Sequence, residues 1–228
     1  MREILIQAEA IAKSYPSGRE SIRVLHGLDL TLYRGEAVAV VGPSGSGKST
    51  LLNLLNGLLR PDGGRLQLLG VDLTQLRERD LADLRRRRIA TLFQDGNLIP
   101  TLSVARNLVF RRTLAGHDSA GAKAWLEALD IAATADRYPD QLSGGQRQRA
   151  ALACALAMEP ELILADEPTG SLDIHNAERV MQLFFDRIGA RGLTALVVTH
   201  NLHLARRCDR VLELVDGALQ PWDWSPSS

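Results

Sequence analysis

The chain has 228 residues, of which 45% are hydrophobic, enough for one large domain or two small ones around a substantial core. Lysine and arginine together number 27, as do aspartate and glutamate, so the overall charge gives no reason to expect nucleic acid or acidic lipid as a partner. The two cysteines, Cys154 and Cys208, make neither a disulfide framework nor a metal-binding pair, which favours a reduced, cytosolic compartment.

The N-terminal part of the chain predicts β-structure. Residues 1–7 lack the long apolar region of a signal peptide, and no later run approaches the roughly 20 apolar residues that span a bilayer. We therefore expect no direct membrane span, so another polypeptide must cross the membrane if the protein works there. From Ile4 to Val41 the pattern predicts short strands that are separated by turns at residues 16–18 and 34–35.

A phosphate-binding motif of the form Gly-x-x-x-x-Gly-Lys-Ser follows these strands. An apolar run before it, Ala37–Val41, predicts a buried strand, and Leu51–Leu59 predicts a helix behind it, which is the context that this motif requires. The glycines allow successive N–H groups to point at phosphate oxygens, and the helix start adds the positive end of its dipole. Lys48 would then reach the β- and γ-phosphates, and the Ser49 hydroxyl would bind Mg²⁺; the alternative is a chance glycine-rich turn. The candidate phosphate-binding residues are Gly42, Pro43, Ser44, Gly45, Ser46, Gly47, Lys48, Ser49 and Thr50.

The middle of the chain predicts a change from strands to helices. Residues 60–64 end the helix that follows the phosphate motif. The later segments are predicted as a strand at 65–69, a charged helix at 74–87, a strand at 89–94 and a mostly helical region at 100–158, with Pro139 as a break.

A second candidate anion site lies in the helical region. Residues 142–148, Leu-Ser-Gly-Gly-Gln-Arg-Gln, precede an apolar helix that is predicted over Arg149–Met158. Ser143 is predicted to cap this helix, and Gly144 and Gly145 leave backbone N–H groups exposed at its start. Since the first motif already holds one nucleotide, the economical interpretation is that this site faces the nucleotide of another subunit. The alternative is simple helix capping.

Two carboxylates end the next predicted strand. Residues 161–168 form an apolar run that ends in Asp166 and Glu167, and Pro168 terminates it. The carboxyl ends of parallel strands are where such folds bind ligands. Asp166 is suited to hold Mg²⁺ through water, and Glu167 is suited to polarise a water for in-line attack on a γ-phosphate. The alternative is an ordinary acidic loop.

The C-terminal part alternates between strand and helix. Strands are predicted at 162–165, 194–198 and 211–214, and helices at 176–188 and 202–207. This alternation predicts an α/β fold with a mainly parallel sheet and helices on both faces. Residues 222–228 predict a loose tail, although they include Trp222 and Trp224.

With these motifs the chain resembles the nucleotide-binding subunits of ATP-binding cassette (ABC) transporters, from about Ile4 to Leu219. Leu-Ser-Gly-Gly-Gln at residues 142–146 is that family's signature. The resemblance implies an α/β fold of the P-loop NTPase (RecA-like) type, with a small antiparallel β subdomain. It places the ATP-binding domain at 1–221 and a helical insert at about 97–158.

The resemblance also implies ATP and Mg²⁺ as cofactors and a second nucleotide-binding subunit, expected to be an identical chain. In the family two such subunits pack head to tail, so that Ser143, Gly144, Gly145 and Gln146 would complete the ATP site of the partner. Integral membrane permease subunits are the other implied partners. The implied location is the cytoplasmic face of the inner membrane, peripheral through those subunits.

Four further roles come from the resemblance alone. Tyr15 matches the aromatic residue that stacks on adenine, with a strand-edge tyrosine as the alternative. Gln94 matches the glutamine that touches Mg²⁺ and water and senses the membrane subunit, with a structural polar residue as the alternative. Asp173, in the segment 171–173, matches the loop that crosses between subunits, with a helix cap as the alternative. His200 matches the γ-phosphate switch, so that Glu167, His200 and Gln94 are the implied catalytic residues.

Residues 165–173 and 93–102 look like those of the lipoprotein-release, macrolide-export and cell-division branch of the family. Three positions depart from the family pattern. Cys154 stands where arginine is common, Arg106 replaces a frequent glutamate near the membrane-subunit contact, and Asn201 stands where aspartate is common. None of them touches the implied phosphate chemistry.

The mechanism that we expect is ATP-driven closure of a two-subunit sandwich, reopened by hydrolysis. An importer ATPase and a soluble ABC-type ATPase without a transport role remain alternatives. A kinase or GTPase outside this family is disfavoured, because the chain has the signature and lacks the guanine-reading Asn-Lys-x-Asp motif.

Overall fold

The computed structural model describes residues 2–18, 20–94, 96–170 and 172–224. The chain forms two compact units, and each is described by itself. The first unit contains residues 1–81 together with 196–228, and the second contains residues 82–195. Helix α2 (Glu78–Arg87) and strand β8 (Thr194–Val198) each begin in one unit and end in the other.

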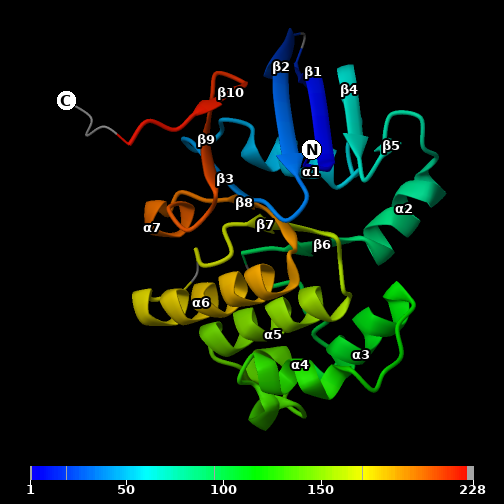
Figure 1. Ribbon diagram of the computed structural model, residues 1–228, viewed down its shortest axis with the longest axis vertical. Coiled ribbons are helices and arrows are strands. Elements are labelled where there is room, and N and C mark those ends of the chain that lie inside the picture. The colour runs from blue at the N-terminus through cyan, green and yellow to red at the C-terminus, as the bar shows by residue number, and fades with distance from the viewer. Residues whose placement is uncertain (1, 19, 95, 171, 225–228) are drawn as a thin grey trace. The chain divides into compact units, whose positions relative to one another are not determined.

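The first unit contains an antiparallel sheet with the strand order β2-β1-β4-β5 (Figure 1). Its strands are β1 (Ile4–Ser17), β2 (Glu20–Tyr33), β4 (Gly63–Leu68) and β5 (Val71–Asp72). The short strands predicted for this region were wrong, because β1 and β2 are 14 residues each and pair along their length. Register shifts beside Ala10, at φ 50°, and Gly27, at φ 87°, absorb the extra residues that make the sequence pattern irregular.

The first unit also contains the strand that carries the phosphate motif. This strand, β3 (Ala37–Val41), is buried at every residue and runs parallel to β9 (Arg210–Val215). Strand β9 pairs in turn with the antiparallel β10 (Ala218–Pro221). Two helices complete the unit, α1 (Lys48–Leu55) directly after the phosphate motif and α7 (Leu202–Ala205) before β9.

The second unit combines two parallel strands with the predicted helical insert. Strand β6 (Ile89–Leu92) pairs in parallel with β7 (Leu162–Asp166). In Figure 1, α5 lies between α6 on one side and α3 and α4 on the other, in agreement with their packing contacts. The helices are α3 (Val104–Ala115), α4 (Ala122–Ala128), α5 (Gly144–Ala157) and α6 (Ile174–Arg191), with one-turn 3₁₀ helices η1 (Ala132–Thr134) and η2 (Pro139–Gln141).

The α/β fold class with a separate antiparallel sheet is therefore confirmed, while some boundaries move. Helix α2 begins at Glu78 and not at the predicted residue 74, because the Asp72 carboxylate accepts bonds from the backbone N–H of Thr74 at 3.0 Å and from its hydroxyl at 2.5 Å. These bonds hold residues 72–74 in a turn. Among the described residues, no helix has the length and apolar character needed to cross a bilayer.

Candidate functional site

The phosphate loop of the first unit has a backbone that only glycine allows at several positions. Gly42, Gly45 and Gly47 have φ values of 147°, 80° and 104°. A Cβ at Gly42 would lie 2.5 Å from the Leu214 carbonyl oxygen, and one at Gly47 would lie 2.8 Å from Cγ1 of Val24. The loop is therefore fixed by backbone geometry and by its close approach to β9 and β2.

Hydrogen-bond donors gather at this loop. Gly47 is the N-cap of α1 and no side chain caps the helix, so the first N–H groups of α1 have no acceptor within the helix. The Lys48 ammonium donates to the carbonyls of Gly42 and Pro43, both at 2.8 Å, so it lies over the loop. The hydroxyl of Ser46 is buried without a hydrogen-bond partner among the described residues. This concentration of donors and positive charge suits an anionic ligand with several oxygens, such as a polyphosphate.

Tyr15 and His200 lie in the same unit as this loop. The Tyr15 hydroxyl is 3.3 Å from the Thr50 hydroxyl, which places the half-buried ring beside the start of α1. His200 is exposed and directly follows Thr199, whose N–H donates to the Val40 carbonyl of β3 at 3.1 Å. Within the first unit, Tyr15 of the antiparallel sheet therefore lies beside the start of α1, and His200 follows a residue that is bonded to the strand before the phosphate loop.

The two carboxylates of the second unit stand at the end of β7. Asp166 is the last residue of the strand, and Glu167 follows it with φ 45°, in the left-handed region. This conformation costs on the order of 1–3 kcal/mol for a residue other than glycine. The Glu167 carbonyl accepts the N–H of Gly170 at 3.0 Å, so residues 167–170 form a tight turn.

Gln94 lies against this turn within the second unit. A Cβ at Gly170 would lie 3.1 Å from Nε2 of Gln94, so the amide group packs on the bare glycine. The preceding residue is held by Gln148, which is 2% exposed and donates from Nε2 to the Phe93 carbonyl at 3.2 Å. Gln148 therefore links the Gln94 segment to α5. The sequence analysis did not single out this residue, although it lies two positions after the predicted signature.

The predicted signature residues form the start of α5. Ser143 and Gln146 make a capping box, in which the Ser143 hydroxyl accepts the Gln146 N–H at 3.3 Å and Gln146 Oε1 accepts the Ser143 N–H at 3.1 Å. The prediction of Ser143 as an N-cap is confirmed. Ser143 and Gly144 are exposed, whereas Gly145 is buried and a Cβ there would lie 2.5 Å from Oδ1 of Asn176.

Asp173 caps α6 next to the signature. Its carboxylate accepts the Asn176 N–H at 3.0 Å and the Asn176 side-chain amide at 2.6 Å. These bonds, the side-chain bond foremost, lower the pKa of Asp173 below its usual 3.8. Asp173 is therefore the N-cap of α6, and its role in the loop that crosses between subunits stays a prediction. Asn176 contacts both Asp173 and Gly145. Ser171, in the same predicted loop, lies outside the described residues.

Two further buried polar residues of the helical insert were missed by the sequence analysis. Asn107 is 2% exposed and binds both the N–H and the carbonyl of Ile99, at 2.7 and 3.1 Å, and two further carbonyls at Leu102 and Ser103. It thereby shapes the loop that enters α3. A polar residue among the apolar positions of a helical pattern was the only signal in the sequence.

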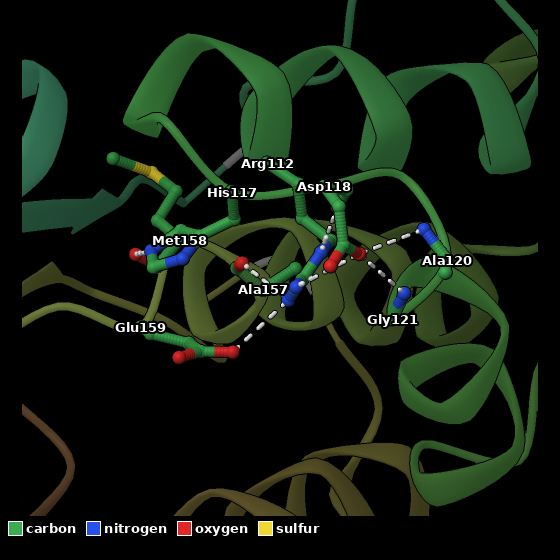
Figure 2. A network of polar contacts seen from close by, with 8 residues as sticks. All are labelled: Arg112, His117, Asp118, Ala120, Gly121, Ala157, Met158 and Glu159. Atoms are coloured by element: carbon green, nitrogen blue, oxygen red, sulfur yellow. Dashed lines mark hydrogen bonds and ion pairs between the residues drawn. The ribbon is translucent and has the colours of Figure 1, made fainter.

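Arg112 is the second of these residues and joins α3 to the end of α5 (Figure 2). It is 6% exposed and donates to the Ala157 carbonyl at 3.2 Å, to Glu159 Oε1 at 3.1 Å and to the Asp118 carbonyl at 2.8 Å. A cation at the carbonyl end of a helix is favoured by the helix dipole. His117 adds a contact of 3.0 Å between Nε2 and the Met158 carbonyl, so both ends of α5 are held by side chains.

The predicted metal ligands suit a hard cation only in combination with a ligand that supplies more oxygens. The described residues contain no group of three or more His, Cys, Asp or Glu side chains that would hold a metal ion alone. Ser49, Asp166 and Gln94 offer hydroxyl, carboxylate and amide oxygens, which Mg²⁺ accepts together with phosphate oxygens and water. Each of these donors, Ser49 in the first unit and Asp166 and Gln94 in the second, therefore has the chemistry that Mg²⁺ accepts.

Comparison with known proteins gives a consistent assignment. The family model described as ABC transporter matches residues 25–170. The chain is 44% identical to the lipoprotein-releasing system ATP-binding protein LolD of Anaeromyxobacter dehalogenans, over 94% of this chain and 92% of that protein. It is 43% identical to the macrolide export ATP-binding/permease protein MacB of Brucella melitensis, over 94% of this chain and 34% of that protein.

Solved structures agree with these relatives. A dimeric ATP-binding cassette in a post-hydrolysis state, bound to ADP and Pi, superposes with a TM-score of 0.88 at 35% identity, over 95% of this chain and 98% of that one. The same family therefore accounts for the sequence, the phosphate loop and the fold. The chain belongs to the ABC transporter family.

Proposed function

We propose that this ABC transporter subunit binds ATP with Mg²⁺ and hydrolyses it to drive a membrane-embedded partner of the lipoprotein-release or macrolide-export kind. The observation that carries the proposal is the phosphate loop, where main-chain donors, the Lys48 ammonium and the buried Ser46 hydroxyl converge. The similarity to LolD over nearly the whole chain supports the choice of partner class.

In the proposed reaction the loop residues 42–50 hold the phosphates, and Lys48 exchanges its two carbonyl acceptors for the β- and γ-phosphate oxygens. Tyr15 stacks on the adenine. Ser49, Gln94 and Asp166 would hold Mg²⁺, which would supply positive charge to the bound phosphates.

Glu167 is the proposed general base. A water oxygen forms a bond to the γ-phosphorus while the bond from that phosphorus to the β–γ bridging oxygen breaks, and Glu167 takes the proton from the water. His200 faces the γ-phosphate as its sensor. The left-handed backbone of Glu167 supports this role, since strain of this kind concentrates at functional positions.

The proposed active assembly is a head-to-tail pair of identical chains. In the capping box, the Ser143 oxygen accepts a hydrogen bond from Gln146, so its own O–H remains available to donate to a phosphate. Ser143 and Gly144 are both exposed at the start of α5, as a donor for a second copy's nucleotide has to be. The dimeric state of a similar cassette supports this arrangement.

A substitution of the proposed base tests hydrolysis and dimerisation together. Glu167→Gln should bind ATP normally, lose turnover by about 100-fold or more, and accumulate dimers in the presence of ATP. Steady-state ATPase assays and light scattering after size exclusion measure these effects. Glu127→Gln, on the exposed face of α4, is the control and should behave as the wild type. Near-normal turnover of Glu167→Gln would remove Glu167 as the base, and full-rate hydrolysis by a monomer would overturn the shared site.

The membrane partner requires a separate experiment. The chain, tagged and purified from detergent-solubilised membranes of its native host, should bring an integral membrane protein with a large extracytoplasmic domain. A stable ATPase dimer that brings no integral protein would instead favour the soluble alternative.

A further inference from the structure

The segment after β10 is held against the strand that carries the phosphate loop. The Trp222 N–H donates to the Val211 carbonyl at 3.0 Å, which continues the pairing of the segment with β9. The Trp222 side chain packs on a buried cluster of Ala39, Val41 and Ala205. Ala39 and Val41 belong to β3, and Val41 directly precedes Gly42 of the phosphate loop. The predicted looseness of residues 222–228 does not extend to Trp222, and residues 225–228 lie outside the described residues.

Trp224 adds a second contact, on the far end of α7. Its ring lies 6.0 Å from that of Trp222 in an edge-to-face arrangement, and the guanidinium of Arg206 stands 4.7 Å from its centroid. Arg206 is the C-cap of α7, and Ala205 under Trp222 is the last residue of that helix. The two indoles therefore contact the C-terminal end of α7, Trp222 at Ala205 and Trp224 at Arg206.

The other end of α7 begins two residues after His200. The N-cap is Asn201, whose side-chain oxygen accepts the N–H groups of His203 and Leu204 at 3.0 and 3.3 Å. A helix of four residues is too short to be stable by itself, so its position depends on what packs against it. We therefore expect a shift of the indoles to move α7, whose N-cap directly follows His200.

We propose that Trp222 and Trp224 are positioning residues for His200, and that the C-terminal segment acts as a brace that sets the imidazole relative to the phosphate loop. This inference rests on the proposed ATPase function. It assigns a role in turnover to residues that lie beyond the matched family region, which ends at residue 170.

The brace acts through apolar contact. The indole Nε1 of Trp222 is buried without a hydrogen-bond partner among the described residues, so its N–H contributes no bond. The Cys208 thiol also packs in this cluster, and burial raises its pKa to about 12, which keeps it an uncharged packing group. A phenylalanine at position 222 should therefore preserve most of the function, whereas an alanine should not.

The test compares turnover and binding in a set of full-length variants. Trp222→Ala should lower kcat by about tenfold while the KM for ATP stays within about twofold. The reason is that a displaced His200 imidazole slows turnover, whereas the phosphate loop that binds ATP keeps its structure. Trp222→Phe should recover most of the rate. Trp224→Ala, which removes an exposed ring, should reduce kcat by about threefold without risk to folding. Trp125→Phe in α4 controls for the loss of an indole as such.

The His200→Ala background separates positioning from general stability. Trp222→Ala should have no further effect on kcat there, because the group that it positions is absent. The same tenfold loss in that background, or wild-type rates for both tryptophan variants, would overturn the proposal.

An NMR measurement is independent of activity. The imidazole resonances of His200 should broaden or shift in Trp224→Ala without nucleotide, and unchanged resonances would contradict the brace. If the wild-type chain hydrolysed no ATP, the proposed function would be wrong. The spectrum would still show whether Trp224 affects the position of His200.

Discussion

The two units hold their candidate site residues by different physical means. In the first unit, glycine conformations and a fully buried strand fix the phosphate loop, so the hydrogen-bond donors that it presents are mostly main-chain groups. In the second unit, buried polar side chains tie helices and loops together: Gln148 and Arg112 bind carbonyls far away in the chain, and Asn107 binds carbonyls of the loop just before it. A site made of main chain tolerates side-chain exchange but not an added Cβ. In a region that is held by side chains, each substitution removes the contacts of one residue and lowers the stability by that amount.

The largest effect should come from an added Cβ in the phosphate loop. In Gly42→Ala the added Cβ would lie 2.5 Å from the Leu214 carbonyl oxygen, so the loop would have to shift. ATP binding should weaken by about 100-fold, because the displaced N–H groups lose charge-assisted hydrogen bonds to the phosphates. Isothermal titration with ATP and Mg²⁺ measures this loss. Gly45→Ala is the matched control, because it shares a positive φ but has open space around the Cβ, and should lose much less. Equal affinity in both variants would show that the loop adapts.

Loss of the α3–α5 link should come next. Arg112→Met removes bonds to Ala157 and Glu159 and should lower the free energy of unfolding by about 3 kcal/mol, measured by urea denaturation. Affinity for ATP should change less than about twofold, because the phosphate loop belongs to the other unit. Arg106→Met, on the exposed face of α3, should be neutral. A large loss of ATP affinity in Arg112→Met would contradict the expectation that contacts in the second unit leave the phosphate loop unaffected.

A smaller loss is expected at the loop that enters α3. Asn107→Ala should cost about 2 kcal/mol, because it leaves the Ile99 N–H and nearby carbonyls without their partner. Hydrogen exchange at the Ile99 amide should become faster, and the free energy of opening derived from its rate should fall by a similar amount. Thr113→Ala, exposed on the same helix, is the control. Unchanged exchange at Ile99 would mean that other contacts hold the loop.

The smallest effect concerns Asp173. Its folded pKa is lowered, so its stabilising contribution is complete above the unfolded value near 3.8 and is lost as pH falls through the folded value. Asp173→Asn should therefore flatten the dependence of stability on pH below about pH 4, whereas the exposed Asp136→Asn should not. Denaturation midpoints between pH 2 and pH 5 measure the difference. An identical profile for Asp173→Asn and wild type would contradict the cap.

The sequence predicted the parts of the molecule that depend on local conformation. The phosphate loop, the capping by Ser143 and the strand at 194–198 each follow from a short run of residues. The roles of Arg112 and Gln148 could not be predicted, because their acceptors lie 45 and 55 residues away in the chain. The same holds for Trp222, whose partners Ala39 and Val41 are at the other end of the sequence. Site roles that come from resemblance, such as that of Tyr15, remain predictions.

The backbone of Glu167 has a consequence for the choice of amino acid at that position. Glycine, asparagine and aspartate all enter the left-handed region more readily than glutamate does. Glycine would relax the turn but carries no carboxylate, and aspartate would keep the charge on a side chain one methylene shorter. Glutamate at this position keeps the longer side chain, although it adopts the left-handed backbone less easily than the other three residues. Aspartate is therefore the informative replacement: it should adopt this backbone more readily and, if Glu167 is the base proposed above, should hold its carboxylate farther from the attacking water.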